Sequence, residues 1–174
     1  LIDADLVQKA IQTLARFKSS SNDAIRTKTK GKVATVGQRD KLLDFLGEEL
    51  GFFIPDLRKD TLVRYIESDE TPWTVKEILS ARLDGSASST AKYKKILATL
   101  NSDHRLRGNL WFYGAHTGRW TGAGAQLQNL PRQTLKQDQV DQGIEAIKNE
   151  TLELLFDDAI SEIAKNAVRG CIIA

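Results

Sequence analysis

Side chains suited to binding nucleic acid are concentrated between His104 and Gln137. This stretch contains no Asp or Glu, and its cations are Arg105, Arg107, Arg119, Arg132 and Lys136. It also holds five of the chain's twelve glycines, together with aromatic and amide side chains. Cations attract phosphates and glycine lets a backbone approach a ligand closely, so the composition indicates contact with nucleic-acid backbone and grooves. The alternative is a glycine-rich hairpin whose arginines are only solvated.

Other kinds of site lack the residues they need. A nucleotide-binding P-loop requires Gly-Lys-Ser or Gly-Lys-Thr after its glycines, and neither follows Gly118 to Gly124. The single cysteine, Cys171, cannot form an internal disulfide. Together with His104 and His116 it provides too few and too scattered ligands for a zinc site. We therefore expect no metal site and no disulfide.

The composition is that of a globular protein. The chain has 174 residues, of which 41% are hydrophobic and 28% are charged. No apolar run approaches the ~20 residues that cross a bilayer, and the N-terminus lacks the features of a signal peptide. These features predict a soluble, cytoplasmic protein without a membrane partner. The absence of methionine and the apolar end at 169–174 predict a piece of a longer chain.

The spacing of apolar residues predicts mostly helices. Asp3 is available as the N-cap of the first helix, and Gly51 can end the second in a left-handed conformation. A strand is expected within 106–113, where consecutive side chains alternate faces, so at least one of Trp111, Phe112 and Tyr113 should be core. A second strand is expected at 169–174. The expected fold is mainly α with a small β-ribbon, an α+β class, with helices over 3–18, 42–50, 62–66, 72–84, 88–101 and from 141 onward.

Two motifs resemble a known family. Thr117-Gly118-Arg119-Trp120, followed by Gln126-Leu127-Gln128-Asn129-Leu130-Pro131-Arg132, resembles the TGR and LQN(I/L)P signature of family A DNA polymerases, the bacterial DNA polymerase I group. The form of 105–120 is similar to the phage and prophage members. The resemblance extends over nearly the whole chain, but 124–126 reads Gly-Ala-Gln where the cellular enzymes have Asp-Pro-Asn.

The resemblance implies part of a DNA-directed DNA polymerase, a nucleotidyltransferase of DNA replication in the cytoplasm of a bacterium or a phage-infected host. It implies a helical thumb over 1–101. Over 102–174 it implies a partial palm with a β-ribbon, the glycine-rich motif, two helices and the start of a strand. The implied partners are a primer–template DNA duplex and the rest of the polymerase chain, namely fingers, remaining palm and a 3′–5′ exonuclease domain. Mg²⁺ is the cofactor implied for the complete enzyme. Its carboxylate ligands would follow Ala174, so the chain alone is expected to be inactive and to hold no catalytic residue.

The resemblance also implies roles for individual residues. Arg119 would donate into the minor groove at the primer-terminal pair, where purine N3 and pyrimidine O2 are acceptors in every base pair. The alternative is a surface arginine paired with the acidic C-terminal helices. Gln128 and Asn129 would contact the groove or backbone through uncharged amides, unless these amides cap their own loop. The other DNA contacts are expected from Thr117, Gln126, Arg132, Arg105 and Arg107.

Two smaller groups are candidates for phosphate contacts. At the start of a predicted helix, free backbone N–H groups, hydroxyls and a cation favour a phosphate, and the residues there are Ser88, Ser89 and Lys92. A plain helix cap is the alternative for Ser88. The basic run 26–32 would hold duplex phosphates if it forms the tip of the thumb, or would be an exposed charged loop, and its lysines are Lys28, Lys30 and Lys32.

Two rival functions remain open from the sequence. One is a stand-alone, non-enzymatic DNA-binding module, and the other is a protein–protein clamp that uses the acidic helices of 138–165. An aspartate-bearing strand encoded shortly after Ala174 would favour the polymerase, and a stop codon would favour the module. The clamp predicts no affinity for nucleic acid.

Overall fold

The computed structural model describes residues 1–85, 89–156 and 159–173. These residues are mainly helical and contain one two-stranded antiparallel sheet, so the predicted α+β class is confirmed. The chain divides into two compact units, residues 1–15 with 88–174 and residues 16–87. Helix α1 (Ala4–Lys28) begins in the first unit and ends in the second. The division into a thumb over 1–101 and a palm over 102–174 is a functional one and remains a prediction.

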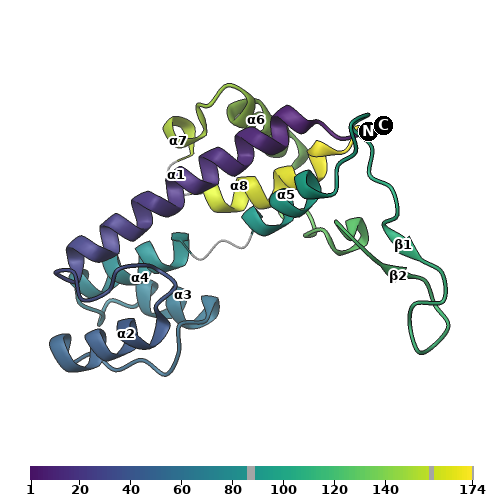
Figure 1. Ribbon diagram of the computed structural model, residues 1–174. Coiled ribbons are helices and arrows are strands. Elements are labelled where there is room, and N and C mark those ends of the chain that lie inside the picture. The colour runs from purple at the N-terminus through teal and green to yellow at the C-terminus, as the bar shows by residue number, and fades with distance from the viewer. Residues whose placement is uncertain (86–88, 157–158, 174) are drawn as a thin grey trace. The chain divides into compact units, whose positions relative to one another are not determined.

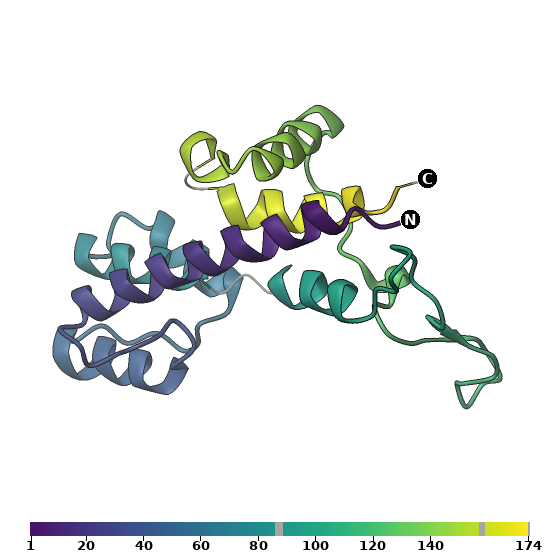
Figure 2. The ribbon, with the colours of Figure 1, turned by 45° about the horizontal axis from the view of Figure 1, so that its top comes forward.

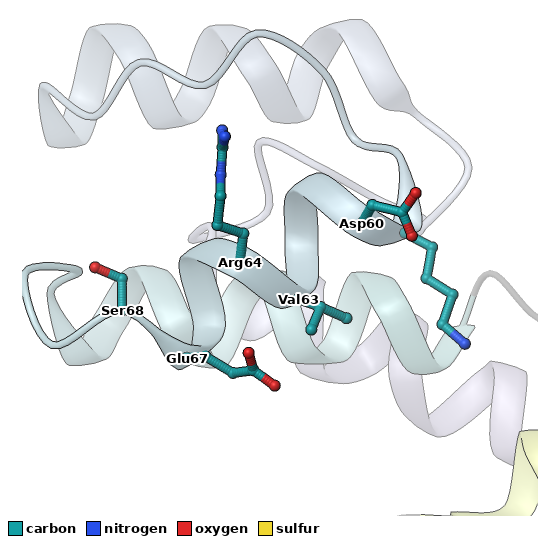
Figure 3. Close-up of a pocket in the computed structure, with 6 residues that line it drawn as sticks. Asp60, Val63, Arg64, Glu67 and Ser68 are labelled. Atoms are coloured by element: carbon teal, nitrogen blue, oxygen red, sulfur yellow. The ribbon is translucent and has the colours of Figure 1, made fainter.

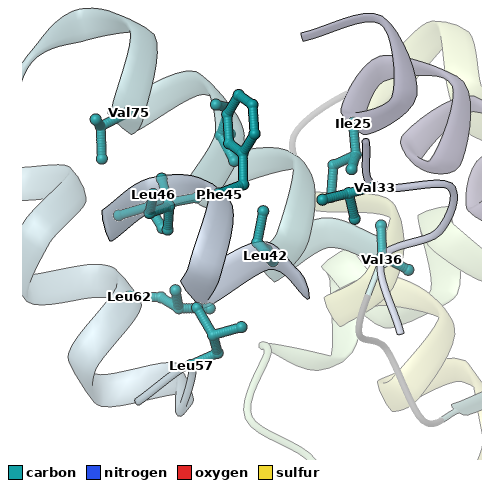
Figure 4. Close-up of a cluster of buried hydrophobic side chains, with 11 residues drawn as sticks. Ile25, Val33, Val36, Leu42, Phe45, Leu46, Leu57, Leu62 and Val75 are labelled. Atoms are coloured by element: carbon teal, nitrogen blue, oxygen red, sulfur yellow. The ribbon is translucent and has the colours of Figure 1, made fainter. Parts of the chain in front are cut away.

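The unit formed by 16–87 is built around a single apolar cluster. Its elements after α1 are α2 (Arg39–Asp44), the π-helical turn η1 (Phe45–Glu49), α3 (Lys59–Glu67) and α4 (Trp73–Gly85). Leu42 and Leu46 from the second predicted helix meet Leu62 of α3 in this cluster (Figure 4). Gly51 has φ +63°, so the predicted left-handed end of that helix is confirmed.

Helix α1 ends ten residues later than the predicted helix over 3–18. Beyond the predicted end, Ile25 is completely buried and Ser21 nearly so. The Ser21 hydroxyl donates to the Phe17 carbonyl at 3.1 Å, which satisfies the hydroxyl inside the helix. Burial of the later apolar residues therefore outweighs the low helix propensity of serine.

The other unit consists of packed helices and the two-stranded sheet. After the start of α1 it contains α5 (Ser89–Ala98), α6 (Gln137–Lys148), α7 (Leu152–Leu155) and α8 (Ile160–Ala167). Helix α8 lies against both α6 and α5 (Figure 1). Gly143 allows the close approach to α8, since a Cβ there would lie 2.3 Å from Ile163 Cγ2. The buried Tyr93 hydroxyl donates to the Ala164 carbonyl at 2.7 Å and joins α5 to α8.

The two ends of the chain lie side by side in this unit (Figure 2). Ile2 forms an antiparallel bridge with Ile172, and Asp3 accepts the Leu6 N–H at 3.0 Å, so the predicted N-cap is confirmed. The strand expected at 169–174 is wrong for its first residues, because Val168–Cys171 is a 3-10 helix, η4. The cause is the burial of Val168 and Cys171, which continues the apolar face of α8. No described helix is long and apolar enough to span a membrane.

Candidate nucleic-acid interface

The glycine-rich stretch forms a ribbon that projects from its helices (Figure 1). Strand β1 (Leu110–Trp111) pairs antiparallel with β2 (Thr121–Gly122). The pairing is much shorter than the predicted strand over 106–113. All three of the aromatic residues 111–113 are exposed, so the expectation that at least one is core is wrong. Alternation can bury one face only where a neighbouring element covers it, and no described element covers this ribbon.

The TGR motif occupies the turn that joins the two strands. The Gly118 N–H donates to the Ala115 carbonyl at 2.9 Å, and the Ala115 N–H donates to the Arg119 carbonyl at 3.2 Å. Gly118 has φ +75°, and a Cβ there would lie 2.8 Å from Cε2 of Tyr113. This glycine is therefore required both for the turn and for the ring packed on it. Thr117 is exposed beside it.

Arg119 is exposed, and its guanidinium has no partner among the described residues. Arg119 forms no ion pair with any described acid of the C-terminal helices, which was the alternative role considered for it. The Arg105 and Arg132 side chains are equally exposed and equally without a described partner. Three cations on this surface are thus available to an anion or an acceptor outside the chain.

Arg107 differs from these three arginines because it already has a partner. Its guanidinium donates two hydrogen bonds to Asp103, at 2.8 and 2.5 Å. The hydrogen bonds from Arg107 hold the pKa of Asp103 at about 2. A phosphate would have to compete with this carboxylate, so Arg107 is a weaker candidate for DNA contact than Arg119.

The amides that follow the ribbon form a small network. Gln126 is left-handed, with φ +48°, and its Oε1 accepts a hydrogen bond from Asn129 Nδ2 at 2.9 Å. Gln126 and Asn129 therefore cap their own loop. The Gln128 amide lies on Gly122, where a Cβ would come within 1.6 Å of Nε2. Gln128 and Asn129 are both exposed, so their remaining polar atoms face solvent.

Asn109 holds the two sides of the ribbon together, a role that the sequence did not reveal. Its carbonyl accepts the Ala123 N–H at 2.8 Å, and its Oδ1 accepts the Ala125 N–H at 3.1 Å. Gly124 lies so close that a Cβ would be 2.7 Å from this Oδ1. The segment 123–125 therefore depends on one asparagine sixteen residues away.

Arg169 and Asn166 position the segment that follows the amides. Arg169 donates through Nε to the Pro131 carbonyl at 2.9 Å and through Nη2 to the Leu130 carbonyl at 3.2 Å. Leu130 is extended, with ψ 145°, as the residue before a proline should be. The buried Asn166 accepts the Thr134 N–H at 2.6 Å. Only its polarity on an otherwise apolar helix face could have marked Asn166 as unusual.

The predicted phosphate contacts outside the ribbon are separate from it. Ser88 lies outside the described residues, and Ser89 begins α5. Thr99, just after α5, has its methyl group close to Gly124 of the glycine-rich stretch. Lys92 lies on α5 seven residues before Thr99, so its backbone is about 10 Å from that contact along the helix axis. Its side chain is half-buried and has no partner among the described residues.

Two of the three lysines in the basic run form ion pairs with acidic side chains. Lys28 forms an ion pair with Glu77 at 2.8 Å, and Lys32 forms one with Glu49. Lys30 is exposed on a left-handed residue with φ +51°. The run therefore begins in the last turn of α1 and continues into the turn after it, and its charge is partly neutralised. It is a weaker candidate for phosphate binding than the ribbon.

No other described feature offers a site for chemistry. A shallow pocket is lined mainly by side chains of α3. Its charged side chains point in different directions, as Figure 3 shows for Asp60, Arg64 and Glu67. The described residues contain no group of three His, Cys, Asp or Glu side chains that could hold a metal ion. The residues present therefore do not fit the Mg²⁺ site of a complete polymerase, and no step of nucleotidyl transfer follows from them.

Comparison with known proteins gives one informative match. Over 95% of its length the chain is 32% identical to a protein of Bacillus phage SP02 named DNA polymerase. The chain is therefore related to a phage DNA polymerase, although it spans only 26% of that protein. No family model matches the chain, and no solved structure matches it.

Proposed function

We propose that this chain is the primer–template-binding part of a DNA polymerase of the family A type. Residues 1–101 are its thumb and 102–174 the start of its palm. The proposal is supported by the similarity to the phage polymerase over nearly the whole chain and by the TGR and LQNLP motifs. In the complete enzyme, carboxylates in the rest of the polymerase chain hold the catalytic Mg²⁺.

The observation that carries this proposal is the unpartnered guanidinium of Arg119. A polymerase must hold every correctly paired primer end, so it should read acceptors that all base pairs share. Purine N3 and pyrimidine O2 in the minor groove are such acceptors. Arg119 is presented on a tight turn and has no described internal partner to lose, so it can donate to them. Arg105, Arg132 and the Gln128 amide, all exposed, provide the surrounding contacts to the backbone.

Arg119→Ala in the complete polymerase is expected to weaken the transition-state contact by roughly 1–3 kcal/mol, measured as slower extension from a matched primer end. A mismatched end already displaces the minor-groove acceptors, so its extension should suffer less. The ratio of the extension rate from the matched end to that from the mismatched end should therefore decrease. The measurement is steady-state extension of both primers at one fixed salt concentration.

Arg132→Ala and Arg105→Ala are the matched controls, because both arginines are exposed and without a described partner, as Arg119 is. As general cations, they should weaken duplex binding and reduce its salt dependence without changing the ratio. Arg119→Ala with wild-type rates on both primers and an intact fold would show that the motif does not contact the primer end.

The chain alone is expected to bind primer–template duplex without sequence preference and to extend no primer with any divalent metal. The physical reason is the lack of a metal-binding carboxylate group among the described residues. Primer extension assays with Mg²⁺ or Mn²⁺ check this, with duplex binding measured on the same preparation to prove that it is folded. Extension above the background of a mock purification would contradict the assignment, and strong preference for one duplex sequence would favour a specific DNA-binding module.

A further inference from the structure

We infer that the ribbon also carries a stacking surface for the unpaired bases of single-stranded DNA. This surface, the aromatic ridge, consists of Trp111, Phe112, Tyr113 and Trp120. It is distinct from the duplex contact proposed for Arg119, because its ligand is the face of an unpaired base and not the groove of a duplex. Either contact can exist without the other.

The rings of the aromatic ridge are exposed to a degree unusual for such side chains. Trp111 is 64% exposed, Phe112 74%, Tyr113 69% and Trp120 62%. Phe112 contacts both Tyr113 and Trp120, and a contiguous exposed apolar surface normally marks an interaction site. All four residues lie on the ribbon, which projects from the helices of its unit (Figure 1). A ligand can therefore reach the rings without displacing another described element.

The geometry of the rings leaves their faces open. Phe112 and Trp120 meet edge to face, with centroids 5.2 Å apart and planes inclined by 67°. Tyr113 lies 6.2 Å from Phe112 at 52° and rests on the backbone of Gly118. Edge-to-face contact holds the rings in place but covers only part of their π surface. The exposed parts are platforms for flat aromatic ligands.

The charge around the aromatic ridge selects an anionic ligand. Between His104 and Gln137 there is no carboxylate, and Arg119 directly precedes Trp120. A second exposed apolar site provides the contrast, because Leu154 is 84% exposed and Leu155 64%, next to the acid Glu153. Flat rings beside a free cation match bases linked by phosphates, whereas aliphatic side chains beside an acid do not.

Unpaired bases fit this surface better than a duplex does. In a duplex both faces of each base are stacked on neighbouring pairs, so protein rings cannot reach them without paying for unstacking. A single strand offers free faces, and every base has one, so binding should tolerate any sequence. In a polymerase the natural ligand of this chemistry is an unpaired stretch of template or primer.

The test uses tryptophan fluorescence of the chain. Trp111 and Trp120 belong to the aromatic ridge, and Trp73, the third tryptophan, lies in the other unit. In a Trp73→Phe background, titration with a twelve-nucleotide oligo(dT) should quench the emission, because stacked bases quench indole. An abasic strand of the same length carries the phosphates without the bases. It should bind more weakly and leave the emission nearly unchanged.

Phe112→Ala in the same background should weaken oligo(dT) binding roughly 5- to 150-fold, the effect of losing one stacked base. The slope of affinity against salt should not change, because no charge is removed. Arg119→Ala should instead reduce that slope by about 0.7, the value for one phosphate contact on a single strand. Leu154→Ala, at an equally exposed apolar residue of the same unit, is the control and should leave the affinity unchanged.

Equal binding and quenching by the abasic strand would overturn the inference, as would unchanged affinity of Phe112→Ala. An unchanged affinity of Phe112→Ala for oligo(dT) is also the result expected if the aromatic ridge is instead a packing surface for another part of a longer polymerase chain. Duplex titrations separate this test from that of the proposed function. Loss of oligo(dT) binding in Phe112→Ala with duplex affinity intact supports the aromatic ridge, whatever the outcome for Arg119 at a primer end.

Discussion

Alkylation of Cys171 by iodoacetamide at pH 8 is expected to be about a thousand-fold slower in the folded chain than in the unfolded chain. Burial and, to a smaller extent, the negative charge of Asp3 raise the pKa of this thiol from 9.0 to about 12, against the opposing effect of Lys148. Only the thiolate attacks the reagent, so three pKa units reduce the reactive population by that factor. The chain has a single cysteine, so mass spectrometry reports this site without ambiguity.

The sign of the pH dependence follows from the same shift. The folded state holds the thiol proton more tightly than the unfolded state, so the contribution to stability is fully present below pH 9. It is lost as the pH rises toward 12. The free energy of unfolding should therefore fall over this range, and Cys171→Ala should show a smaller fall. A folded rate at pH 8 within ten-fold of the unfolded rate would mean that η4 exposes its cysteine.

Sequence periodicity predicted the helices well because each of them buries one apolar stripe. Spacing in 72–84 predicted α4, which runs from Trp73 to Gly85. The failures occurred where local signals and tertiary packing disagree. The spacing of apolar residues predicted a helix only as far as residue 18, but burial of Ile25 extends α1 to Lys28. The isoleucines of 172–173 suggested a strand, but packing of Val168 and Cys171 winds the preceding residues into η4.

The candidate site was predictable in its exposed parts and not in its supports. The lack of acids around Arg119 is visible in the sequence, and so is the proline that keeps Leu130 extended. The partners of the supporting residues are not visible. Asn109 binds Ala125, and Arg169 binds the carbonyl of Pro131, 38 residues away. These hydrogen bonds depend on which distant segments the fold brings together, and no local sequence pattern predicts them.

The same reasoning explains the error at the aromatic residues. Alternation of Trp111, Phe112 and Tyr113 requires an extended strand, but β1 ends at Trp111 and Tyr113 is left-handed, with φ +55°. The rings of Phe112 and Tyr113 therefore lie 6.2 Å apart instead of on opposite faces. The ribbon pairs over only two residues per strand, and its aromatic side chains are largely exposed. Its exposure is a property of the tertiary structure, and it is what makes the ribbon a candidate interface.

Leu46→Ala is expected to lower the free energy of unfolding by about 2–5 kcal/mol, the cost of a cavity in a well-packed core. Leu46 is completely buried in the apolar cluster of the unit formed by 16–87 (Figure 4). It lies in the π-helical turn η1, and its carbonyl accepts the Phe52 N–H at 2.8 Å. Because that turn and the helices around it share one core, they cannot easily collapse into the cavity. Urea unfolding followed by circular dichroism measures the change.

Two further variants make this test specific to packing. Leu46→Met keeps nearly the same volume and should cost less than about 1.5 kcal/mol. Leu154→Ala removes the same atoms at a side chain that is 84% exposed, so its effect should stay within about 0.5 kcal/mol. If Leu46→Ala were as mild as Leu154→Ala, Leu46 would not be part of a packed core. The arrangement of η1 among α2, α3 and α4 would then be wrong.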